Sequence, residues 1–515
     1  SSRIQAHEIA RYASTLTYQV DAGASDAIVF PEHGPFDKRL GYVHMPKMLD
    51  RAQAHGMEVA HQARFSQALL DYTLRGYFAP YQEKTQAGLH IVDNQGRPVY
   101  QFSYPRRVYV SYEAVPSMIT QALLFIENRE LLSPDRPFMN PAIDWLRFSK
   151  AGLHMAANRV GLDYETMGAS TIATQIEKYR HSPQGITASP KAKLRQMASA
   201  SVRAYMTGPE TLPARQSLVL TYFNTLPLYG APGYGEVHGL GDGLWVWFGA
   251  DFDQVNRLLS MPVAEGDTLE AQGKALRQVL SLLIAQRRPS YYLSQRGHTA
   301  LNELTASYMR LLAAEGHISD RMRDAGLAQD VSFRDFKTNP ITTSVETDKG
   351  SLMVRTHLTG LLGKSLYDLD RLDLAATTSL EHDLQTQVSD YLRRLNDPEF
   401  AKSVGLFGER LLAPKRTEQV RYSFTLYERT PQGNLVRVQT DNTDQPFDLN
   451  AGSKLELGST AKLRMLVTYL EVIAEIHDRY TGQSAKELRK ALAEPQDNLS
   501  RWVLIYLLNA RDISL

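Results

Sequence analysis

The spacing of hydrophobic and polar positions changes twice along the chain. Residues 1 to about 85 mix short helical patterns with loops. Two alternating runs in GLHIVDNQGRPVYQFSY (88–104) flank the turn residues Asn94 to Gly96, which predicts a β-hairpin. Helical periodicity dominates from Pro116 to about residue 330, and mixed helical and strand patterns follow. The pattern predicts a mainly α part followed by an α/β part.

The length of 515 residues favours several domains, at roughly 150 residues each. We divide the chain into an N-terminal region of unknown role (1–85), a mainly α domain (86–330), a linker rich in Thr, Asp and Asn (331–370), and an α/β domain (371–515). A second hairpin is predicted around Pro431 to Gly433.

Composition narrows the classes of function. The chain has 57 basic and 56 acidic residues, a balance that argues against bulk nucleic-acid binding. It has no Cys, which excludes disulfides, thiolate catalysis and Cys-based metal sites. No run of 18 apolar residues is present, so no membrane span is predicted.

An apolar helical run in QALLFIENREL (121–131) ends abruptly in a carboxylate. Leu123 to Ile126 are hydrophobic, and Glu127 follows directly. A buried helix with a polar end is one interpretation, and a carboxylate delivered to the rim of a cleft is the other.

Two later stretches have residues suited to an anion. In GASTIATQIEK (168–178), hydroxyl residues precede a predicted helix on which Gln175 and Lys178 share a face. That arrangement suits a phosphate or diphosphate, although an ordinary helix cap with an exposed lysine has the same pattern. The basic cluster Lys191, Lys193 and Arg195 is more typical of a solvated face than of an anion site.

The order and spacing of these motifs resemble the family 51 glycosyltransferase domain of class A penicillin-binding proteins, the peptidoglycan polymerases. The resemblance covers residues 86–330 and rests on the stretches IVDNQGRPV, VSYEAVPSMITQALLFIENREL, GASTIATQIEK, KLRQ, LVLTYFN, GYGEVHGLGDGLWVWFGAD and LSLLIAQRRPSYYL.

The resemblance implies a lysozyme-like fold and a defined reaction. Lipid II would be polymerised into β-1,4 glycan strands with inversion, and undecaprenyl diphosphate would leave. Glu127 would be the general base. Mg²⁺ or another divalent cation could assist at the diphosphate, without assigned protein ligands. The residues implied to bind substrate or diphosphate are Ser170, Thr171, Gln175, Lys178, Lys193, Arg195, Gln196 and Asn224.

Two departures from the family pattern favour an alternative. Asn128 stands where the family has an Asp beside the catalytic Glu, and Gln196 stands where the third motif has a Glu. A catalytically weakened scaffold or regulator that binds lipid II is therefore the alternative, and a lysozyme-like hydrolase is a third possibility. Between the first two motifs, residues 141–161 include Trp145 and Lys150 and are expected either to pack in the core or to dip into a membrane.

Ser459 and Lys462 lie three apart at the start of a predicted amphipathic helix. One helical turn separates them, so a neutral lysine amine could take the serine proton. Together with TTSLEHDLQ (377–385), the LGSTAKL stretch resembles the start of a penicillin-binding transpeptidase domain, with Ser459 as acyl nucleophile and Lys462 as its base. The Ser-x-Asn and Lys-Thr-Gly elements of that fold are not found after Lys462, so we expect an incomplete domain that forms no stable penicillin adduct alone.

The resemblance also implies a location and partners. We expect the periplasmic face of a bacterial inner membrane, with the membrane anchor missing from this chain. The expected partners are lipid II, the growing glycan strand, the membrane surface, other cell-wall synthesis proteins, and β-lactams at Ser459 if the transpeptidase domain is completed; no nucleic acid is expected.

Overall fold

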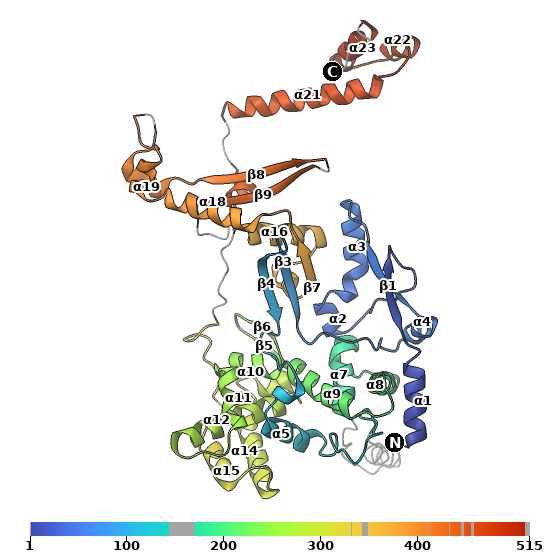
Figure 1. Ribbon diagram of the computed structural model, residues 1–515, viewed down its shortest axis with the longest axis vertical. Coiled ribbons are helices and arrows are strands. Elements are labelled where there is room, and N and C mark those ends of the chain that lie inside the picture. The colour runs from blue at the N-terminus through green and yellow to red at the C-terminus, as the bar shows by residue number, and fades with distance from the viewer. Residues whose placement is uncertain are drawn as a thin grey trace. The chain divides into compact units, whose positions relative to one another are not determined.

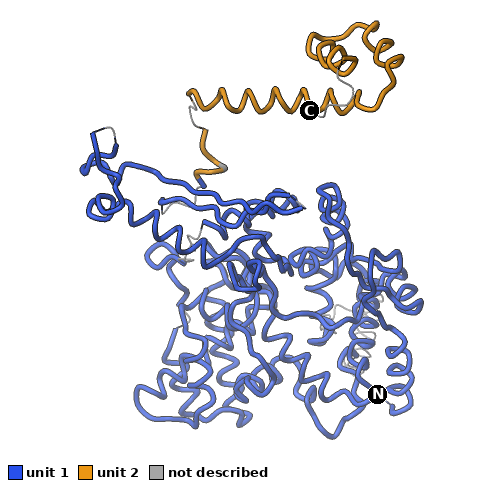
Figure 2. Tube along the Cα trace, turned by 45° about the horizontal axis from the view of Figure 1, so that its top comes forward, with its two compact units in different colours: residues 1–448 blue, residues 449–515 orange. Residues whose placement is uncertain are grey.

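The computed structural model describes residues 2–143, 170–330, 332–341, 349–409, 411–431, 433–443, 448–454 and 458–509. The chain forms two compact units, residues 1–448 and 449–515 (Figure 2). The segment with Trp145 and Lys150, predicted to pack in the core or contact a membrane, lies outside the described residues.

The N-terminal region is folded onto helix α8 (Pro190–Ala204). Ala13, Leu69 and Tyr72 pack against Val202, and Ala6 of the first helix packs against Tyr205 at the end of α8. The elements of this region are α1 (Arg3–Ala13), β1 (Tyr18–Ala22), α2 (Pro35–Arg39), the 3-10 turn η1 (Tyr42–His44), α3 (Met45–Ala54), β2 (His61–Phe65) and α4 (Gln67–Leu74), with β1 and β2 antiparallel (Figure 1).

A helical part follows and contains the largest core, which confirms the mainly α prediction for the described residues of 86–330. Helix α12 (Gly266–Ala285) lies in the middle of this core, and Leu276, Val279, Leu280 and Leu283 are almost completely buried. Its other elements are η2 (Tyr112–Ala114), α5 (Ser117–Glu127), α7 (Ile172–His181), η3 (Pro183–Gly185), α8, α9 (Leu212–Thr225), β5 (Pro227–Ala231), β6 (Gly235–His238), α10 (Leu240–Phe248), α11 (Phe252–Ser260), α13 (Pro289–Tyr292), α14 (His298–Ala314) and α15 (Asp320–Leu327).

A three-stranded sheet joins segments that are far apart in the chain. The predicted hairpin forms from β3 (Ala87–Val92) and β4 (Pro98–Tyr104), and β7 (Asp373–Thr377) pairs parallel with β3 (Figure 1). Helices α16 (Lys349–Leu362) and α17 (Leu366–Leu369) lie in the stretch expected to be a linker. Val354 and Leu369 from these helices pack with Leu89 and Ile91 of β3, so residues 349–369 belong to a folded core.

The second predicted hairpin is also present, as β8 (Ser423–Thr430) and β9 (Gly433–Asp441). It packs on α18 (His382–Arg394), where the Gln385 side-chain amide donates to the carbonyl of Gln439 at 2.8 Å. The short elements α19 (Pro398–Ser403) and η4 (Pro414–Gln419) lie between α18 and β8.

The second compact unit contains helices and no strand among its described residues. It contains α20 (Leu449–Gly452), α21 (Thr460–Tyr480), α22 (Ala485–Ala493) and α23 (Asn498–Asn509), with Ile476, Leu488, Val503 and Leu504 in a small core. An α/β transpeptidase-type fold for residues 371–515 stays a prediction. Within the ranges that the structure describes, no helix combines the length and apolar character needed to cross a membrane.

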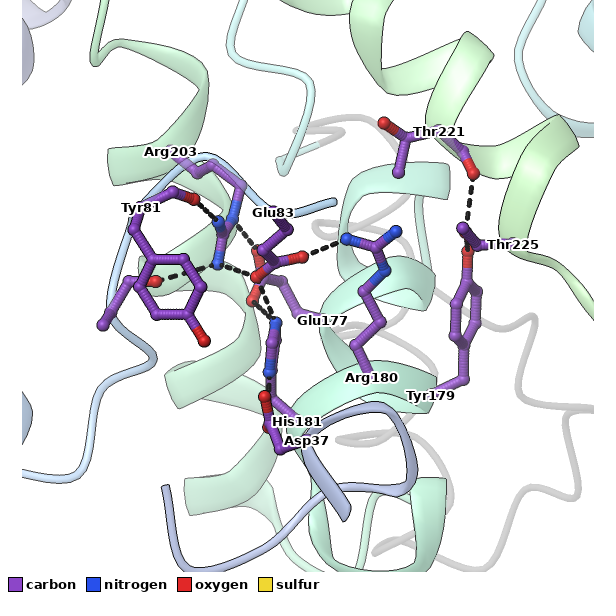
Figure 3. A network of polar contacts seen from close by, with 11 residues as sticks. Asp37, Tyr81, Glu83, Glu177, Tyr179, Arg180, His181, Arg203, Thr221 and Thr225 are labelled. Carbon is purple, nitrogen blue, oxygen red and sulfur yellow. Dashed lines mark hydrogen bonds and ion pairs between the residues drawn. The ribbon is translucent and has the colours of Figure 1, made fainter. Parts of the chain in front are cut away.

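A buried ion network ties the N-terminal region to α7 and α8 (Figure 3). It contains three acidic and three basic side chains, Asp37, Glu83, Glu177, Arg180, His181 and Arg203. Arg203 lies 2.9 Å from Glu83 and 2.7 Å from Glu177, and Glu83 also pairs with Arg180. Because equal numbers of both signs meet where water is excluded, each charge depends on its partners.

The imidazole of His181 is held as a cation in this network. Its two nitrogens lie 2.7 Å from Asp37 Oδ2 and 2.6 Å from Glu83 Oε1. Burial alone lowers the pKa of His181, but the charges of Glu83 and Asp37 outweigh burial and raise the pKa to about 10. The three cations in turn hold the pKa of Glu83 well below its usual range, against the effect of burial.

Replacement of Glu83 by Gln should destabilise the first compact unit by about 3–5 kcal/mol, because the change leaves buried cations without their counter-charge. Urea-induced unfolding measures the loss. The matched control is Glu8→Gln, which breaks the exposed Glu8–Arg11 pair and should cost no more than about 1 kcal/mol. Equal small losses in both variants would contradict a stabilising role for the network.

Candidate active site

The predicted general base, Glu127, is the last residue of α5. This helix is anchored by Ile119 and Leu123, which are fully buried in the main core. Asn128 leaves the helix in an extended conformation, and its Oδ1 accepts a hydrogen bond from the backbone N–H of Glu130 at 3.0 Å. The apolar run therefore fixes the helix, and the turn after it leaves Glu127 half-buried at the helix end.

A chain of side-chain amides orients the Glu127 carboxylate. Gln175 Nε2 donates to Glu127 Oε2 at 2.8 Å, and Gln286 Nε2 donates to Gln175 Oε1 at 2.7 Å. Gln175 is buried, and the start of its helix is fixed by a capping box between Thr171 and Thr174. The amide hydrogen bond fixes the orientation of the carboxylate, whose other oxygen can accept a proton as a general base does.

Two lysines bring positive charge to the same place. Lys178 lies one turn after Gln175 on α7, and burial lowers its pKa while the charge of Glu127 raises it. Lys193 of α8 donates from Nζ to Ser170 Oγ at 2.8 Å and to Thr174 Oγ1 at 3.3 Å. Burial and the charge of Lys178 lower the pKa of Lys193 to about 8.

Neither lysine has a carboxylate within ion-pair distance among the residues that the structure describes. The charge of Lys178 lowers the pKa of Lys193, so this pair is suited to an anionic ligand whose charge would relieve the repulsion. The lysines of the predicted basic cluster therefore differ in their surroundings. Lys193 faces this site, whereas Lys191 is exposed.

Three other predicted site residues lie in contacts that support the fold. Asn224 exchanges two hydrogen bonds of 2.8 Å with the backbone of Tyr109. Thr171 is occupied as the N-cap of α7. The guanidinium of Arg195 packs against Gly76, since a Cβ added at that glycine would lie 2.8 Å from Arg195 Nη2.

Gln196 is fully buried in α8. Its Nε2 donates to Ser182 Oγ at 2.9 Å, and its Oε1 accepts from Thr187 Oγ1 at 3.1 Å. Both ends of the amide are therefore used to hold the loop between α7 and α8. The side chain is a structural support here and has no carboxylate charge to offer a substrate or metal.

Residues 95–311 match a family model described as transglycosylase. We call this segment the transglycosylase domain after that match. The match starts in the turn between β3 and β4 and ends within α14, so it includes Glu127, Gln175, Lys178 and Lys193. It confirms the glycosyltransferase part of the predicted resemblance and does not reach Ser459. A comparison with curated proteins found no match.

Two residues close to Glu127 in the transglycosylase domain were not predicted from the sequence. Gln286 lies in a stretch that was recognised only as a helix end, although it completes the amide chain to Glu127. Tyr222 of α9 is fully buried, and its hydroxyl has no hydrogen-bond partner among the described residues. Burial and the charge of Glu127 raise the pKa of Tyr222, so this hydroxyl stays neutral beside the carboxylate. The sequence offered one sign of its role, because Tyr222 lies two residues before Asn224 in the LVLTYFN stretch.

Arg215 was also missed, and it fixes the chain that follows Glu127. Its buried guanidinium donates to the carbonyls of Leu131 at 2.6 Å, Ser133 at 3.2 Å and Arg136 at 2.9 Å. An arginine within a helical pattern gives no sign of such a role, because only the fold brings the three carbonyls together.

Among the described residues, the donor set of the site does not fit a metal held by the protein. Glu127 is the carboxylate near Lys178, and Gln196 adds no carboxylate. Within the part of the chain that the structure describes, no group of three or more His, Cys, Asp and Glu side chains could hold a metal ion. Mg²⁺ prefers several oxygen ligands that include carboxylates.

Ser459 and Lys462 lie at the start of α21, as predicted from their spacing. Ser459 is the N-cap residue, and its carbonyl accepts from the backbone N–H of Lys462 at 3.1 Å. Both residues are exposed in the second unit, and the structure shows no hydrogen bond between their side chains. The first turn of α21 brings Ser459 and Lys462 close together. The described residues of this unit do not enclose them in an acyl-transfer site.

Transglycosylase activity should fall as the pH rises through about 8, because Lys193 loses its positive charge there instead of near the usual 10.5. Lys193→Arg keeps the charge and should move this fall to higher pH. The dependence of kcat/KM on pH reports the free enzyme and is the measurement. Lys191→Arg on the exposed face of α8 is the control and should leave the profile unchanged. Identical alkaline limbs for wild type and Lys193→Arg would exclude Lys193 as the titrating group.

Proposed function

We propose that the transglycosylase domain is a peptidoglycan glycosyltransferase that polymerises lipid II into β-1,4 glycan strands and releases undecaprenyl diphosphate. The observation that supports this best is the placement of one amide-oriented carboxylate, Glu127, near Lys178, whose charge in turn acts on Lys193; neither lysine has an ion-pair partner among the described residues. The reaction needs a base where the acceptor hydroxyl forms the new bond, and positive charge where the bond to the diphosphate breaks.

Glu127 would act on the acceptor sugar. A neutral hydroxyl is a poor nucleophile, so the carboxylate accepts the proton of the 4-hydroxyl as its oxygen attacks the anomeric carbon of the donor. The hydrogen bond from Gln175 fixes the orientation of the carboxylate, and Gln286 fixes Gln175. Attack from the face opposite the leaving group inverts the anomeric centre.

Lys178 and Lys193 would act on the donor. The bond from the anomeric carbon to the diphosphate oxygen breaks, and the diphosphate gains negative charge as it leaves. Preorganised ammonium groups stabilise that charge, and the hydroxyl of Ser170 holds Lys193 in place. We assign this role to the two lysines ahead of Arg195, because the Arg195 guanidinium lies against Gly76.

A weakened scaffold or regulator that binds lipid II is the second candidate. The observation that favours it is the burial of Gln196, whose amide forms structural hydrogen bonds to Ser182 and Thr187. A site that retains its cations but lacks a second carboxylate would still bind a diphosphate, while its catalytic step would be slower.

We also propose that the Ser459 region belongs to a D,D-transpeptidase that cross-links stem peptides. Ser459 Oγ would attack the peptide carbonyl, the Lys462 amine would take the Oγ proton, and the terminal residue of the donor peptide would leave. The support is their placement at the first turn of α21. Such an enzyme would act at the periplasmic face of a bacterial inner membrane.

Glu127→Gln should reduce glycan polymerisation by about 10²–10⁴-fold, because it removes the base and keeps an oxygen that can accept from Gln175. Labelled lipid II is incubated with the protein, and the products are separated by size. Glu113→Gln, an exposed residue before α5, is the matched control and should retain wild-type activity.

The same assay separates the alternatives. Equal polymer from wild type and Glu127→Gln would contradict the role of Glu127. Lipid II binding without polymer in the wild type would establish the scaffold, and cleavage of preformed glycan strands would establish a hydrolase.

The transpeptidase proposal predicts that fluorescent penicillin labels Ser459 in the protein as the cell makes it. Peptide mapping should place the label on Ser459, and Ser459→Ala should abolish it because the acyl bond forms on Oγ. Ser453→Ala, a nearby hydroxyl change, serves as the control. Labelling that persists in Ser459→Ala, or no labelling in the wild type, would contradict the proposal.

A further inference from the structure

A pocket of about 330 Å³ lies in the first compact unit, and none of the candidate active-site residues lines it. One wall comes from α2 of the N-terminal region, and another comes from α17 and the residues that flank it. Its charged lining contains four permanently basic side chains and two carboxylates, Lys38, Arg39, Lys364, Arg371, Glu236 and Asp368.

Arg39 has unused hydrogen-bond donors. Its guanidinium lies over the rings of Phe36 and Tyr104, at 5.4 Å and 5.1 Å from their centroids. Its Nε is buried without a partner, and the structure shows no hydrogen bond or ion pair from Arg39 to any described residue. The aromatic rings hold the cation in place, and its planar set of N–H groups stays available.

Arg371 is a second fixed guanidinium, and its residue is 8% exposed. It donates from Nη1 to the carbonyl of Tyr367 at 3.0 Å and from Nη2 to the carbonyl of Tyr234 at 3.2 Å. Its Nε is buried and has no partner among the described residues. The two backbone carbonyls fix this guanidinium as a second permanent positive charge in the pocket lining.

The remaining cations strengthen the positive potential. Lys38 and Lys364 form no ion pair in the described part of the chain, and burial lowers the pKa of Lys364. His44, which also lines the pocket, has a pKa lowered by burial and by nearby lysines, so it adds no charge at neutral pH. Burial and the charges of Arg39 and Arg371 lower the pKa of His238.

We propose that this pocket binds a small phosphate ester that carries free hydroxyl groups. Guanidinium groups match the geometry of phosphate oxygens, and the four cations outnumber the two carboxylates. Glu236 and Asp368 are acceptors, which suits them to hydroxyls on the same ligand. The volume lies near the lower end of the range for small-molecule sites, about 300–1,000 Å³, so the ligand is compact.

The phosphate ester could be free in solution or part of a lipid headgroup, and the experiment distinguishes the two. Calorimetric titration with glycerol 3-phosphate tests the soluble source. Sedimentation with phosphatidylglycerol vesicles, compared with phosphatidylcholine vesicles, tests the headgroup. Binding in either arm supports the pocket and identifies the source.

Arg39→Gln and Lys364→Gln should each weaken binding about tenfold or more, because each removes a charged hydrogen-bond donor. Lys402→Gln, an exposed lysine on α19 outside the pocket, is the matched control and should bind like the wild type. Lys364 is only half-buried, so its variant tests the proposal even if Arg39→Gln fails to fold.

The proposal is overturned if neither probe binds the wild type, or if both pocket variants bind as well as Lys402→Gln. Because the pocket shares no residue with the candidate active site, glycan polymerisation that fails in the wild type would not affect this result.

Discussion

The position of helix α7 is the constraint on which the rest of the transglycosylase domain depends. One face of the helix presents Gln175 and Lys178 to Glu127, and another face presents Arg180 and His181 to the ion network of the N-terminal region. The faces are coupled because they belong to a single rigid helix. A rotation that moved Gln175 away from Glu127 would also separate buried charges, which is costly where water cannot replace the lost partner.

This coupling gives the N-terminal region a physical role. Its sequence has no recognisable motif, yet Glu83 contacts Arg180, His181 and Arg203 on two helices at once. Together with the direct pair between Arg203 and Glu177, this carboxylate ties α8 to α7. Lys178 lies on the first of these helices and Lys193 on the second, so the network also sets how closely the two lysines approach each other.

Local patterns predicted the elements well. The two hairpins, the apolar helix that ends at Glu127, and the helix with Gln175 and Lys178 on one face all follow from short-range periodicity. The pairing of Glu127 with Gln175 was within reach because both lie in motifs that resemble one family. The arrangement of the whole first unit could not be predicted in this way. Strand β7 pairs with β3 from far along the chain, and periodicity contains no information about such partners.

The candidate site shows the same limit at the level of side chains. Gln286 donates a hydrogen bond to Gln175 although the two residues are 111 positions apart in the sequence. Lys191, Lys193 and Arg195 form one basic cluster in the sequence, but on a helix these positions point in different directions. Lys191 is exposed, Lys193 bonds to Ser170, and Arg195 packs against Gly76, so only the fold determines which of them reaches the site.

Gln196 shows why a departure from a family motif has to be judged by its surroundings. It lies one turn after Lys193 on α8, close enough for a charge at one position to affect the other. A glutamate there would raise the pKa of Lys193 and offset the repulsion from Lys178. The neutral amide leaves that repulsion in place, which agrees with the lowered pKa of Lys193. Gln196 therefore supplies structural hydrogen bonds to Ser182 and Thr187 and adds no negative charge near Lys193. Under the proposed function, a site without that negative charge would bind a diphosphate more strongly before and after reaction, so Gln196 would affect product release as much as the chemical step.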